Sequence, residues 1–372
     1  MKNSILFGDC RDTLKTIDSK VRMCVTSPPY YGLRDYGTAT WIGGDPNCNH
    51  RRDSKVKPEN CNTGHKNHDE MYGVGDAIYK TVCPKCGAVR QDSQIGLEET
   101  PEEYIESLVN VFRGVRDVLT DDGTLWVNLG DSYYNYRPGK GQSYPKQSVS
   151  KTKQDLPDEC NKRGNKLEGL KEKDLIGIPW MFAFAMRKDG WYLRQDIIWH
   201  KPNPMPESVR DRCTKSHEYI FLFSKNRKYF YDNEAIKEPA KDWGTRDRTN
   251  GKYHNPGTGL APHSGLSKSY PTKNKRSVWS VTVKPYKEAH FATYPPDLIE
   301  PCILAGSEEG DTILDPFMGA GTTAAVAKSL NRYYIGCELN EDYGNLIQKR
   351  IQDYQPVNKV AQEPCINILD II

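Results

Sequence analysis

Residues 312–323 read TILDPFMGAGTT, in which a short apolar run leads into a glycine-rich turn. The apolar run predicts a buried strand, and residues 322–330 predict a helix that begins directly after the turn. Glycines let the backbone turn tightly and let a ligand approach the main chain, while the first N–H groups of the helix are unpaired. This stretch therefore predicts a strand–turn–helix unit with a small-molecule site in an α/β fold.

The turn differs from two common ligand-binding loops. A phosphate-binding loop places a lysine after its last glycine, where this chain has Thr322, and the six-residue glycine spacing of dinucleotide sites is absent. The next predicted strand, residues 333–337, is followed by Glu338, where doubly wound folds place a carboxylate that binds ribose. An aspartate before Gly-x-Gly and a glutamate after the following strand together indicate S-adenosylmethionine as the ligand.

Strands and helices alternate on both sides of this unit. Further strands are predicted at residues 4–8, 23–26, 124–129, 192–199 and 219–223, and further helices at 11–17, 100–119, 175–189, 297–304 and 341–351. Thr100 and Pro101 mark the start of one helix, and the sequence Asp-Asp-Gly at 121–123 predicts the turn that ends it. This alternation is typical of a parallel sheet covered by helices.

A second cluster, residues 26–30 (TSPPY), follows a predicted strand near the amino end. Its two prolines fix φ and lack N–H groups, so their carbonyls are rigidly held acceptors. The amino group of a base is a poor nucleophile because its lone pair is delocalised into the ring, and hydrogen bonds accepted from its N–H groups help to free that lone pair. Ser27 and the Pro28 carbonyl are predicted to accept these bonds, and Tyr30 to stack on a base taken out of its helix.

The two clusters together resemble the catalytic and cofactor motifs of beta-class DNA amino-methyltransferases, in which the catalytic motif comes first. The resemblance extends through GD at 8–9, GTLWVNLGDSY at 123–133, IIWHKPNPMPES at 197–208, HEYIFLFSK at 217–225 and HFATYPPDLIEPCI at 290–303. It implies a Rossmann-like methyltransferase sheet with a circularly permuted motif order. It also implies methyl transfer from S-adenosylmethionine to a base amino group in duplex DNA by base flipping.

The resemblance also implies roles for individual residues. Asp9 would accept from the adenine amine of the cofactor, Phe317 would line the adenine pocket, Glu338 would bind the ribose, and residues 290–296 would pack on the methionine portion. The predicted catalytic residues are Ser27, Pro28, Pro29 and Tyr30. The predicted cofactor-binding residues are Asp9, Thr26, Asp315, Pro316, Phe317, Gly319, Gly321, Thr322, Glu338 and His290.

The residue before Pro-Pro-Tyr bears on the choice of base. Serine at this position, here Ser27, resembles enzymes that act on cytosine N4, whereas Asp or Asn is usual for adenine N6. Cytosine N4 is therefore predicted, with adenine N6 as the alternative. A serine hydroxyl is a poor base, so the departing proton is predicted to go to solvent. Methylation of RNA or protein amino groups, or an inactive zinc-containing DNA-binding protein, are the other interpretations.

A metal site is predicted in the segment 37–97, which does not fit the alternation of strands and helices. Eleven cysteines in a chain without secretory features favour metal ligands over disulfides. Cys83 and Cys86 have the spacing of half a zinc site, and Cys48 with His50 would complete a Cys3His set. The competing ligands are Cys61, His65 and His68. Structural zinc would let this apolar-poor segment fold, because metal binding supplies folding free energy.

The predicted division of the chain follows from these motifs. It comprises a catalytic half of the core at 1–36, a zinc-binding insertion at 37–97, further core at 98–231 with a polar loop at 136–172, a target-recognition region at 232–282, a cofactor-binding half at 283–355 and a tail at 356–372. The region 232–282 occupies the place of the variable recognition domain of the resembled family. It is rich in Lys and Arg although the net charge is only +3, which favours double-stranded DNA as partner.

The chain shows no sign of membrane insertion or export. It contains no run of about 20 apolar residues and begins without a signal-peptide pattern, so a cytoplasmic protein with no membrane partner is predicted. A homodimer and a cognate restriction endonuclease are the protein partners that the sequence leaves open.

Overall fold

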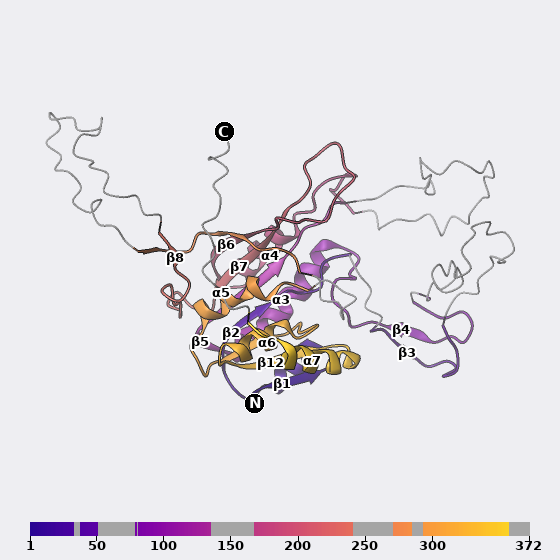
Figure 1. The fold of residues 1–372 in the computed structure, drawn as a ribbon. Coiled ribbons are helices and arrows are strands. Elements are labelled where there is room, and N and C mark those ends of the chain that lie inside the picture. The colour runs from indigo at the N-terminus through magenta and orange to yellow at the C-terminus, as the bar shows by residue number, and fades with distance from the viewer. Residues whose placement is uncertain are drawn as a thin grey trace, which may run out of the picture.

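The computed structural model describes residues 1–32, 38–50, 79, 81–134, 167–240, 271–284 and 293–356. Among these residues, eight strands form a central sheet in the order β1-β12-β11-β2-β5-β7-β6-β10 (Figure 1). The strands are β1 (Ser4–Phe7), β12 (Tyr333–Glu338), β11 (Thr312–Asp315), β2 (Val21–Thr26), β5 (Leu119–Leu129), β7 (His217–Ser224), β6 (Tyr192–His200) and β10 (Val278–Ser280). The first five are mutually parallel, β7 is antiparallel to both neighbours, and β10 is parallel to β6. The predicted α/β class is confirmed.

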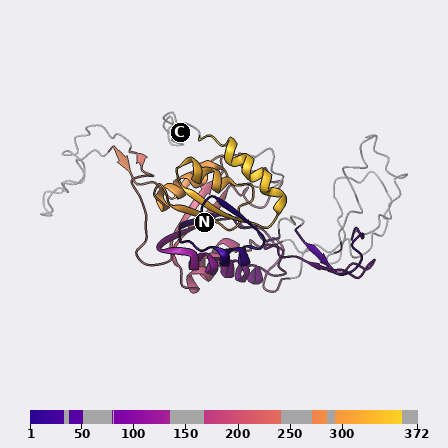
Figure 2. The same cartoon turned by 90° about the horizontal axis from the view of Figure 1, so that it is seen from below.

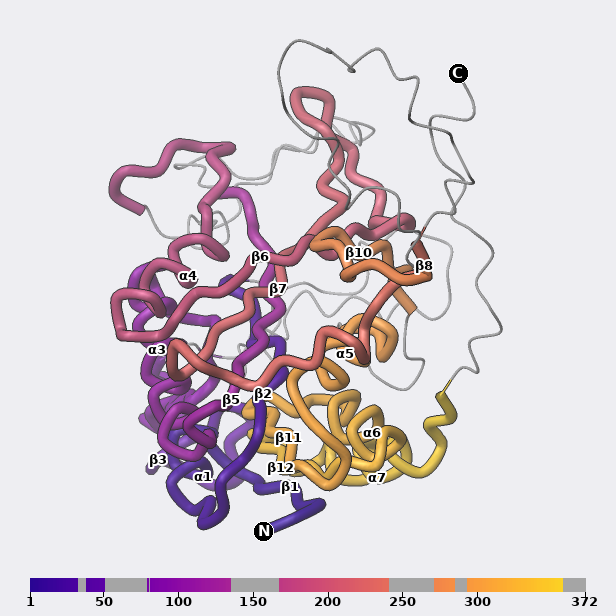
Figure 3. The backbone as a smooth tube through the Cα atoms, turned by 90° about the vertical axis from the view of Figure 1, so that its left-hand side faces the viewer, coloured from indigo at the N-terminus to yellow at the C-terminus, as the bar shows by residue number. Residues whose placement is uncertain are grey.

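Helices cover both faces of this sheet. One face carries α1 (Cys10–Thr13), α3 (Pro101–Val118) and α4 (Ile178–Lys188), and the other carries α5 (Pro296–Gly306), α6 (Thr322–Ser329) and α7 (Gly344–Asp353) (Figure 3). Side chains of β2 alternate between the two layers, because Cys24 packs in one core cluster while Met23 and Val25 pack in the other. Both faces of this central strand are therefore buried, which accounts for its nearly continuous apolar sequence.

The order of the strands fixes where a ligand can bind. From β11 the chain passes through α6 to β12 on one side, whereas from β2 it passes through α3 to β5 on the other. Open α/β sheets bind ligands where neighbouring strands lead away in opposite directions, at their carboxyl ends. Asp315 and Thr26, the last residues of β11 and β2, lie at this point.

Helix α3 closely matches its predicted range of 100–119, but the turn predicted to follow it is wrong. The Thr100 side chain accepts from the Glu103 N–H, and the Glu103 carboxylate accepts from the Thr100 N–H, which forms a capping box. The expected turn at 121–123 lies instead within β5, which begins directly after the helix. A Cβ on Gly123 would lie 3.0 Å from the Arg22 carbonyl oxygen. Glycine therefore lets β5 approach β2 closely at the point where the register between the two strands shifts.

Two short antiparallel strand pairs lie outside the central sheet. Strands β3 (Thr40–Ile42) and β4 (Val89–Gln91) pair within the predicted zinc-binding insertion, and Figures 1 and 2 place this strand pair at one side of the molecule. Strands β8 (Glu238–Pro239) and β9 (Thr272–Lys273) pair within residues 232–282, and β10 at the end of that region joins the central sheet. In the part of the chain that is described, no helix has the length and apolar character needed to span a bilayer.

Candidate active site

A cavity of about 250 Å³ opens at the carboxyl ends of the parallel strands. Among the residues predicted to be functional, those that line it are Ser27, Pro28, Pro29, Tyr30, Asp9, Pro316, Phe317, Gly319, Thr322 and Glu338. Within the described part of the chain, Thr26, Asp315 and Gly321 are not among the lining residues, and His290 lies outside the described residues. The cavity therefore joins the TSPPY segment and the glycine-rich turn in one site.

The glycine-rich turn is held in a conformation that requires glycine. Gly319 has a φ of 53° and Gly321 a φ of 80°, both in the left-handed region. A Cβ on Gly321 would lie 2.9 Å from Cγ2 of Ile347 in α7, so the turn and that helix are in close contact. The Gly319 N–H donates to Oε2 of Glu338 at 2.8 Å, and the Asn340 N–H donates to Oε1 at 2.9 Å. The carboxylate predicted to bind ribose thus also fixes the turn.

Asp315 connects the two halves of the site from behind the cavity. Its buried carboxylate accepts from the Thr26 hydroxyl at 2.5 Å and from the Tyr294 hydroxyl at 3.0 Å. The Phe317 N–H and the Thr323 hydroxyl also donate to it. Burial raises the pKa of Asp315, and these hydrogen bonds oppose that increase. Asp315 therefore fixes the end of β2 against the glycine-rich turn.

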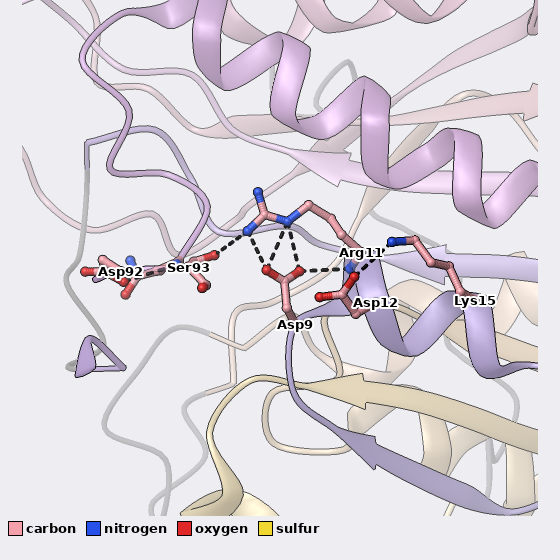
Figure 4. A network of polar contacts seen from close by, with 7 residues as sticks. Asp9, Arg11, Asp12, Lys15, Asp92 and Ser93 are labelled. Carbon is pink, nitrogen blue, oxygen red and sulfur yellow. Dashed lines mark hydrogen bonds and ion pairs between the residues drawn. The ribbon is translucent and has the colours of Figure 1, made fainter. Parts of the chain in front are cut away.

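Asp9, which follows β1 beside the end of β12, also lines the cavity and is bound by Arg11 (Figure 4). The Arg11 N–H and Nε donate to Oδ1 of Asp9 at 2.9 Å, and the guanidinium also contacts Oδ2. Burial opposes ionisation of Asp9, but its hydrogen bonds with Arg11 leave its pKa below the usual value. Arg11 Nη2 also donates to the Ser93 carbonyl at 3.1 Å, which ties the cavity wall to the segment that follows β4.

The prolines of the TSPPY segment are supported by a helix and by the returning insertion. The Tyr104 hydroxyl of α3 donates to the Pro29 carbonyl at 2.7 Å. The Gly32 N–H donates to the Gly96 carbonyl at 2.8 Å, and a Cβ on Gly96 would lie 3.1 Å from the Tyr30 carbonyl. The insertion therefore returns directly over the predicted catalytic segment.

Three polar residues that the sequence analysis did not single out line the same cavity. They are Asn128 at the end of β5, Lys201 directly after β6 and Glu218 at the start of β7. Since β7 runs antiparallel to β5 and β6, these positions meet at one edge of the sheet. All three lie in motifs that carry the family resemblance. Their position as polar residues at the ends of predicted strands could have identified them as candidate site residues.

The predicted metal ligands meet beside the β3–β4 strand pair. Ligand atoms of Cys48, His50, Cys83 and Cys86 all lie within 4.8 Å of one another. The Cys48 and Cys83 sulfurs are 3.8 Å apart, and the Cys86 sulfur is 3.5 Å from Nδ1 of His50. The backbone N–H of Ala88 lowers the pKa of the Cys86 thiol by hydrogen bonding. The alternative ligands Cys61, His65 and His68 lie outside the described residues.

The sequence is similar to those of known methyltransferases. The pattern of the family described as DNA methylase matches residues 21–349. The type II methyltransferase M.SmaI of Serratia marcescens is 40% identical over 353 residues, which cover 93% of this chain and 90% of that protein. M.XycI of Xanthomonas campestris pv. cyanopsidis is 39% identical over 354 residues, which cover 95% of this chain and 89% of that protein.

The fold is also similar to that of a solved structure. The PvuII DNA methyltransferase, described as cytosine-N4-specific, matches with a TM-score of 0.53 and 15% identity. The match covers 97% of this chain and 89% of that chain. At this level of identity the likeness shows a shared fold.

Proposed function

The chain belongs to the DNA methylase family, and from that premise we propose that it transfers a methyl group from S-adenosylmethionine to N4 of cytosine in duplex DNA. It is a type II DNA methyltransferase that acts on a base amino group, as the sequence resemblance indicated. The observation that carries the choice of site is the 2.5 Å hydrogen bond between Thr26 and Asp315. It places the TSPPY segment and the glycine-rich turn side by side at one cavity.

The proposed chemistry uses this adjacency. The glycine-rich turn and Glu338 would hold S-adenosylmethionine, with the carboxylate at its ribose, and Ser27, Pro28 and Tyr30 would form the wall against which the extruded cytosine binds. Ser27 and the Pro28 carbonyl accept hydrogen bonds from the N4 amino group, which frees its lone pair to attack the methyl group. A C–S bond breaks as an N–C bond forms, and N4 then loses a proton to solvent. Ser27 is the residue that supports cytosine over adenine N6.

The test of this proposal reads the base directly. DNA methylated by the purified enzyme is digested to nucleosides and analysed by mass spectrometry, and long-read sequencing of the same DNA locates the modified positions. N4-methylcytosine within one sequence motif is the expected product. N6-methyladenine would overturn the choice of base, and absence of any methylated nucleoside would favour an inactive DNA-binding protein.

Glu338 should make cofactor binding depend on pH. Burial raises its pKa to about 7, with a further contribution from the Asp315 charge. The ionised carboxylate would accept hydrogen bonds from ribose hydroxyls, so affinity should be nearly full above about pH 8 and fall by up to about tenfold per unit below about pH 7. Calorimetric titrations between about pH 5.5 and 8.5 measure this effect. Glu338→Gln should remove the slope, whereas the same change at exposed Glu341 should leave it.

We also propose that Cys48, His50, Cys83 and Cys86 hold a structural zinc ion. A tetrahedral zinc with Zn–S bonds of about 2.3 Å separates two thiolates by about 3.8 Å and a thiolate from an imidazole nitrogen by about 3.5 Å. The contacts of 3.8 Å between sulfurs and 3.5 Å between Cys86 and His50 fit this geometry. Gly87, with a φ of 75°, lets its N–H donate to the Cys83 carbonyl at 2.7 Å in a tight turn around the site.

The metal prediction is tested on the full-length protein prepared without chelators. Elemental analysis should find about one zinc per chain, and Cys83→Ser should lose it. Cys213, an exposed cysteine outside the cluster, offers the matched control, and Cys213→Ser should retain the metal. Loss of zinc should accelerate proteolysis within residues 45–90. If Cys83→Ser keeps its zinc while Cys61→Ser or His65→Ala loses it, the ligand set proposed here is wrong.

Target recognition is proposed for residues 232–282, with the remaining divisions of the chain as predicted from the sequence. Exchanging this region for that of a relative should change the methylated motif and leave the methylated atom unchanged. Since its Lys and Arg residues would contact phosphates, DNA binding should weaken steeply with salt. Sequencing of the modified DNA measures the first effect, and an unchanged motif would contradict the assignment.

A restriction endonuclease of the same specificity is the proposed cellular counterpart, and a homodimer is the proposed assembly.

A further inference from the structure

Asn128, Lys201 and Glu218 form one polar cluster with Tyr30. The Tyr30 hydroxyl donates to Oε2 of Glu218 at 2.7 Å and lies 3.2 Å from Oδ1 of Asn128. The Asn128 amide donates to the same Glu218 oxygen at 3.3 Å and to the Tyr219 carbonyl at 3.1 Å. Lys201 pairs with the other Glu218 oxygen, Oε1. Glu218 therefore accepts hydrogen bonds from three different side chains.

The cluster is largely withdrawn from water although it lines the cavity. Lys201 is 19% exposed and Glu218 15% exposed, and Asn128 is buried. In such surroundings, removing one partner of an ion pair is costly because the other charge is left unpaired. Burial and the nearby Glu218 carboxylate raise the pKa of Tyr30 well above its ordinary value. The phenol therefore stays protonated and remains a donor to Glu218.

The ring of Tyr30 is fixed at its edge as well as at its hydroxyl. A Cβ on Gly130 would lie 2.6 Å from Cε2 of Tyr30, so glycine at this position lets the ring pack against the backbone that follows β5. Hydrogen bonding at one end and close backbone contact along the ring leave Tyr30 a single orientation. A residue that stacks on an extruded base benefits from such fixation, because less side-chain entropy is lost on binding.

Lys201 has hydrogen-bonding capacity beyond its ion pair. An ammonium group has three N–H donors and no acceptor, and Glu218 accepts from one of them. Its Nζ lies 4.3 Å from the centroid of the Trp199 ring, which also lines the cavity. On the same edge as its N4 amino group, cytosine presents two acceptors, N3 and O2. A fixed cation beside the cavity suits these acceptors.

We propose that Lys201 binds the N3 and O2 acceptor edge of the extruded cytosine, and that Glu218 with Asn128 is the positioning pair that fixes both Lys201 and Tyr30. This inference rests on the proposed function, because it names how the same site recognises its base. Ser27 and Pro28 engage the donor side of the base, and Lys201 engages its acceptor side. The cytosine edge is thereby read by groups from the TSPPY segment and from the end of β6.

The test uses the full-length enzyme with a duplex that contains its own methylation motif, as located by sequencing. Lys201→Met should lower kcat/KM for this duplex about ten- to hundredfold, because a hydrogen bond from a charged donor is lost. Glu218→Ala should lower kcat similarly, whereas Glu218→Gln keeps an acceptor for Tyr30 and should recover part of that loss. Affinity for S-adenosylmethionine should stay within about twofold in all three variants, since the cluster is proposed to contact the base.

A second measurement follows the base itself. With 2-aminopurine at the target position, extrusion raises fluorescence, and Glu218→Ala should reduce this rise while Glu218→Gln retains more of it. Asp121→Asn is the matched control, because it removes a carboxylate–lysine pair with Lys225 at the opposite ends of the same two strands. Its kinetics and fluorescence should equal those of the wild type.

The outcomes separate this inference from the proposed function. If the wild-type enzyme methylates cytosine but Lys201→Met and Glu218→Gln behave like Asp121→Asn, the inference is wrong and the proposed function stands. If the wild-type enzyme forms no N4-methylcytosine, the proposed function fails. Should Glu218→Ala fold poorly, as its melting temperature would show, the isosteric Glu218→Gln and the separate Lys201→Met still decide the question.

Discussion

Ser27→Ala should lower the rate of methyl transfer about a hundred- to a thousandfold, the effect typical of removing one fixed hydrogen-bonding group at a reacting atom. Affinity for S-adenosylmethionine should remain within a few-fold, because Ser27 lies on the proposed base side of the cavity and the glycine-rich turn on the other. Tyr30→Ala should be at least as damaging, since it removes both the aromatic face and the hydroxyl that binds Glu218. Single-turnover kinetics and calorimetry measure the two quantities separately.

Tyr31 provides the control for this prediction. It is the next residue in the chain, its hydroxyl donates to the Glu99 carbonyl at 3.1 Å, and within the described part of the chain it does not line the cavity. Tyr31→Ala should lower stability without a comparable loss of rate per folded molecule. Loss of cofactor binding in both Ser27→Ala and Tyr30→Ala would contradict the division of the cavity into a base side and a cofactor side.

Gly319→Val should reduce affinity for S-adenosylmethionine by roughly a hundredfold or more, since a branched residue is strained at a φ of 53° and fills space beside the ligand. The Gly319 N–H would also move away from Glu338, so the carboxylate proposed to bind the ribose would lose one of its fixed donors. Isothermal titration calorimetry measures the change directly.

Gly310 allows backbone strain to be separated from blockage of the site. It has a φ of 82°, and a Cβ there would meet no heavy atom within 4 Å. Gly310→Val should therefore lower the melting temperature yet retain cofactor affinity. Equal affinities for Gly319→Val and the wild type would remove the turn from the cofactor site.

Asp315→Ala should weaken cofactor binding through the turn, because its carboxylate accepts from the Phe317 N–H behind the cavity.

Local sequence patterns predicted the parts of the site that follow parallel strands. The run before Asp315 and the run before Ser27 are each buried on both faces, so they stand out as apolar segments, and the turns that follow them carry the cofactor and base motifs. The rule that ligands bind where the strand order reverses then places the two turns together. The spacing of cysteine and histidine residues likewise predicted four metal ligands, and the structure brings their ligand atoms within 4.8 Å of one another.

The remaining features depend on pairing between distant segments. Lys201 and Glu218 face the cavity because β7 is antiparallel to its neighbours, and neither residue belongs to a local pattern that fixes strand direction. The turn expected at 121–123 failed for a similar reason, because Gly123 meets the backbone of β2 rather than reversing the chain. Strand β10, with three residues, is too short for its sequence alone to assign it to the sheet edge.

The hydrogen bond between Thr26 and Asp315 joins residues that are 289 positions apart, and this separation has a consequence for synthesis in the cell. On the ribosome, the segment proposed to activate the base emerges long before its neighbouring strand β11 and the turn proposed to bind the methyl donor. Until then β2 lacks one of its two strand partners, and a nascent chain has no complete active site. A chain that stops before β11 should therefore have no partial activity, because it lacks the turn that completes the cavity.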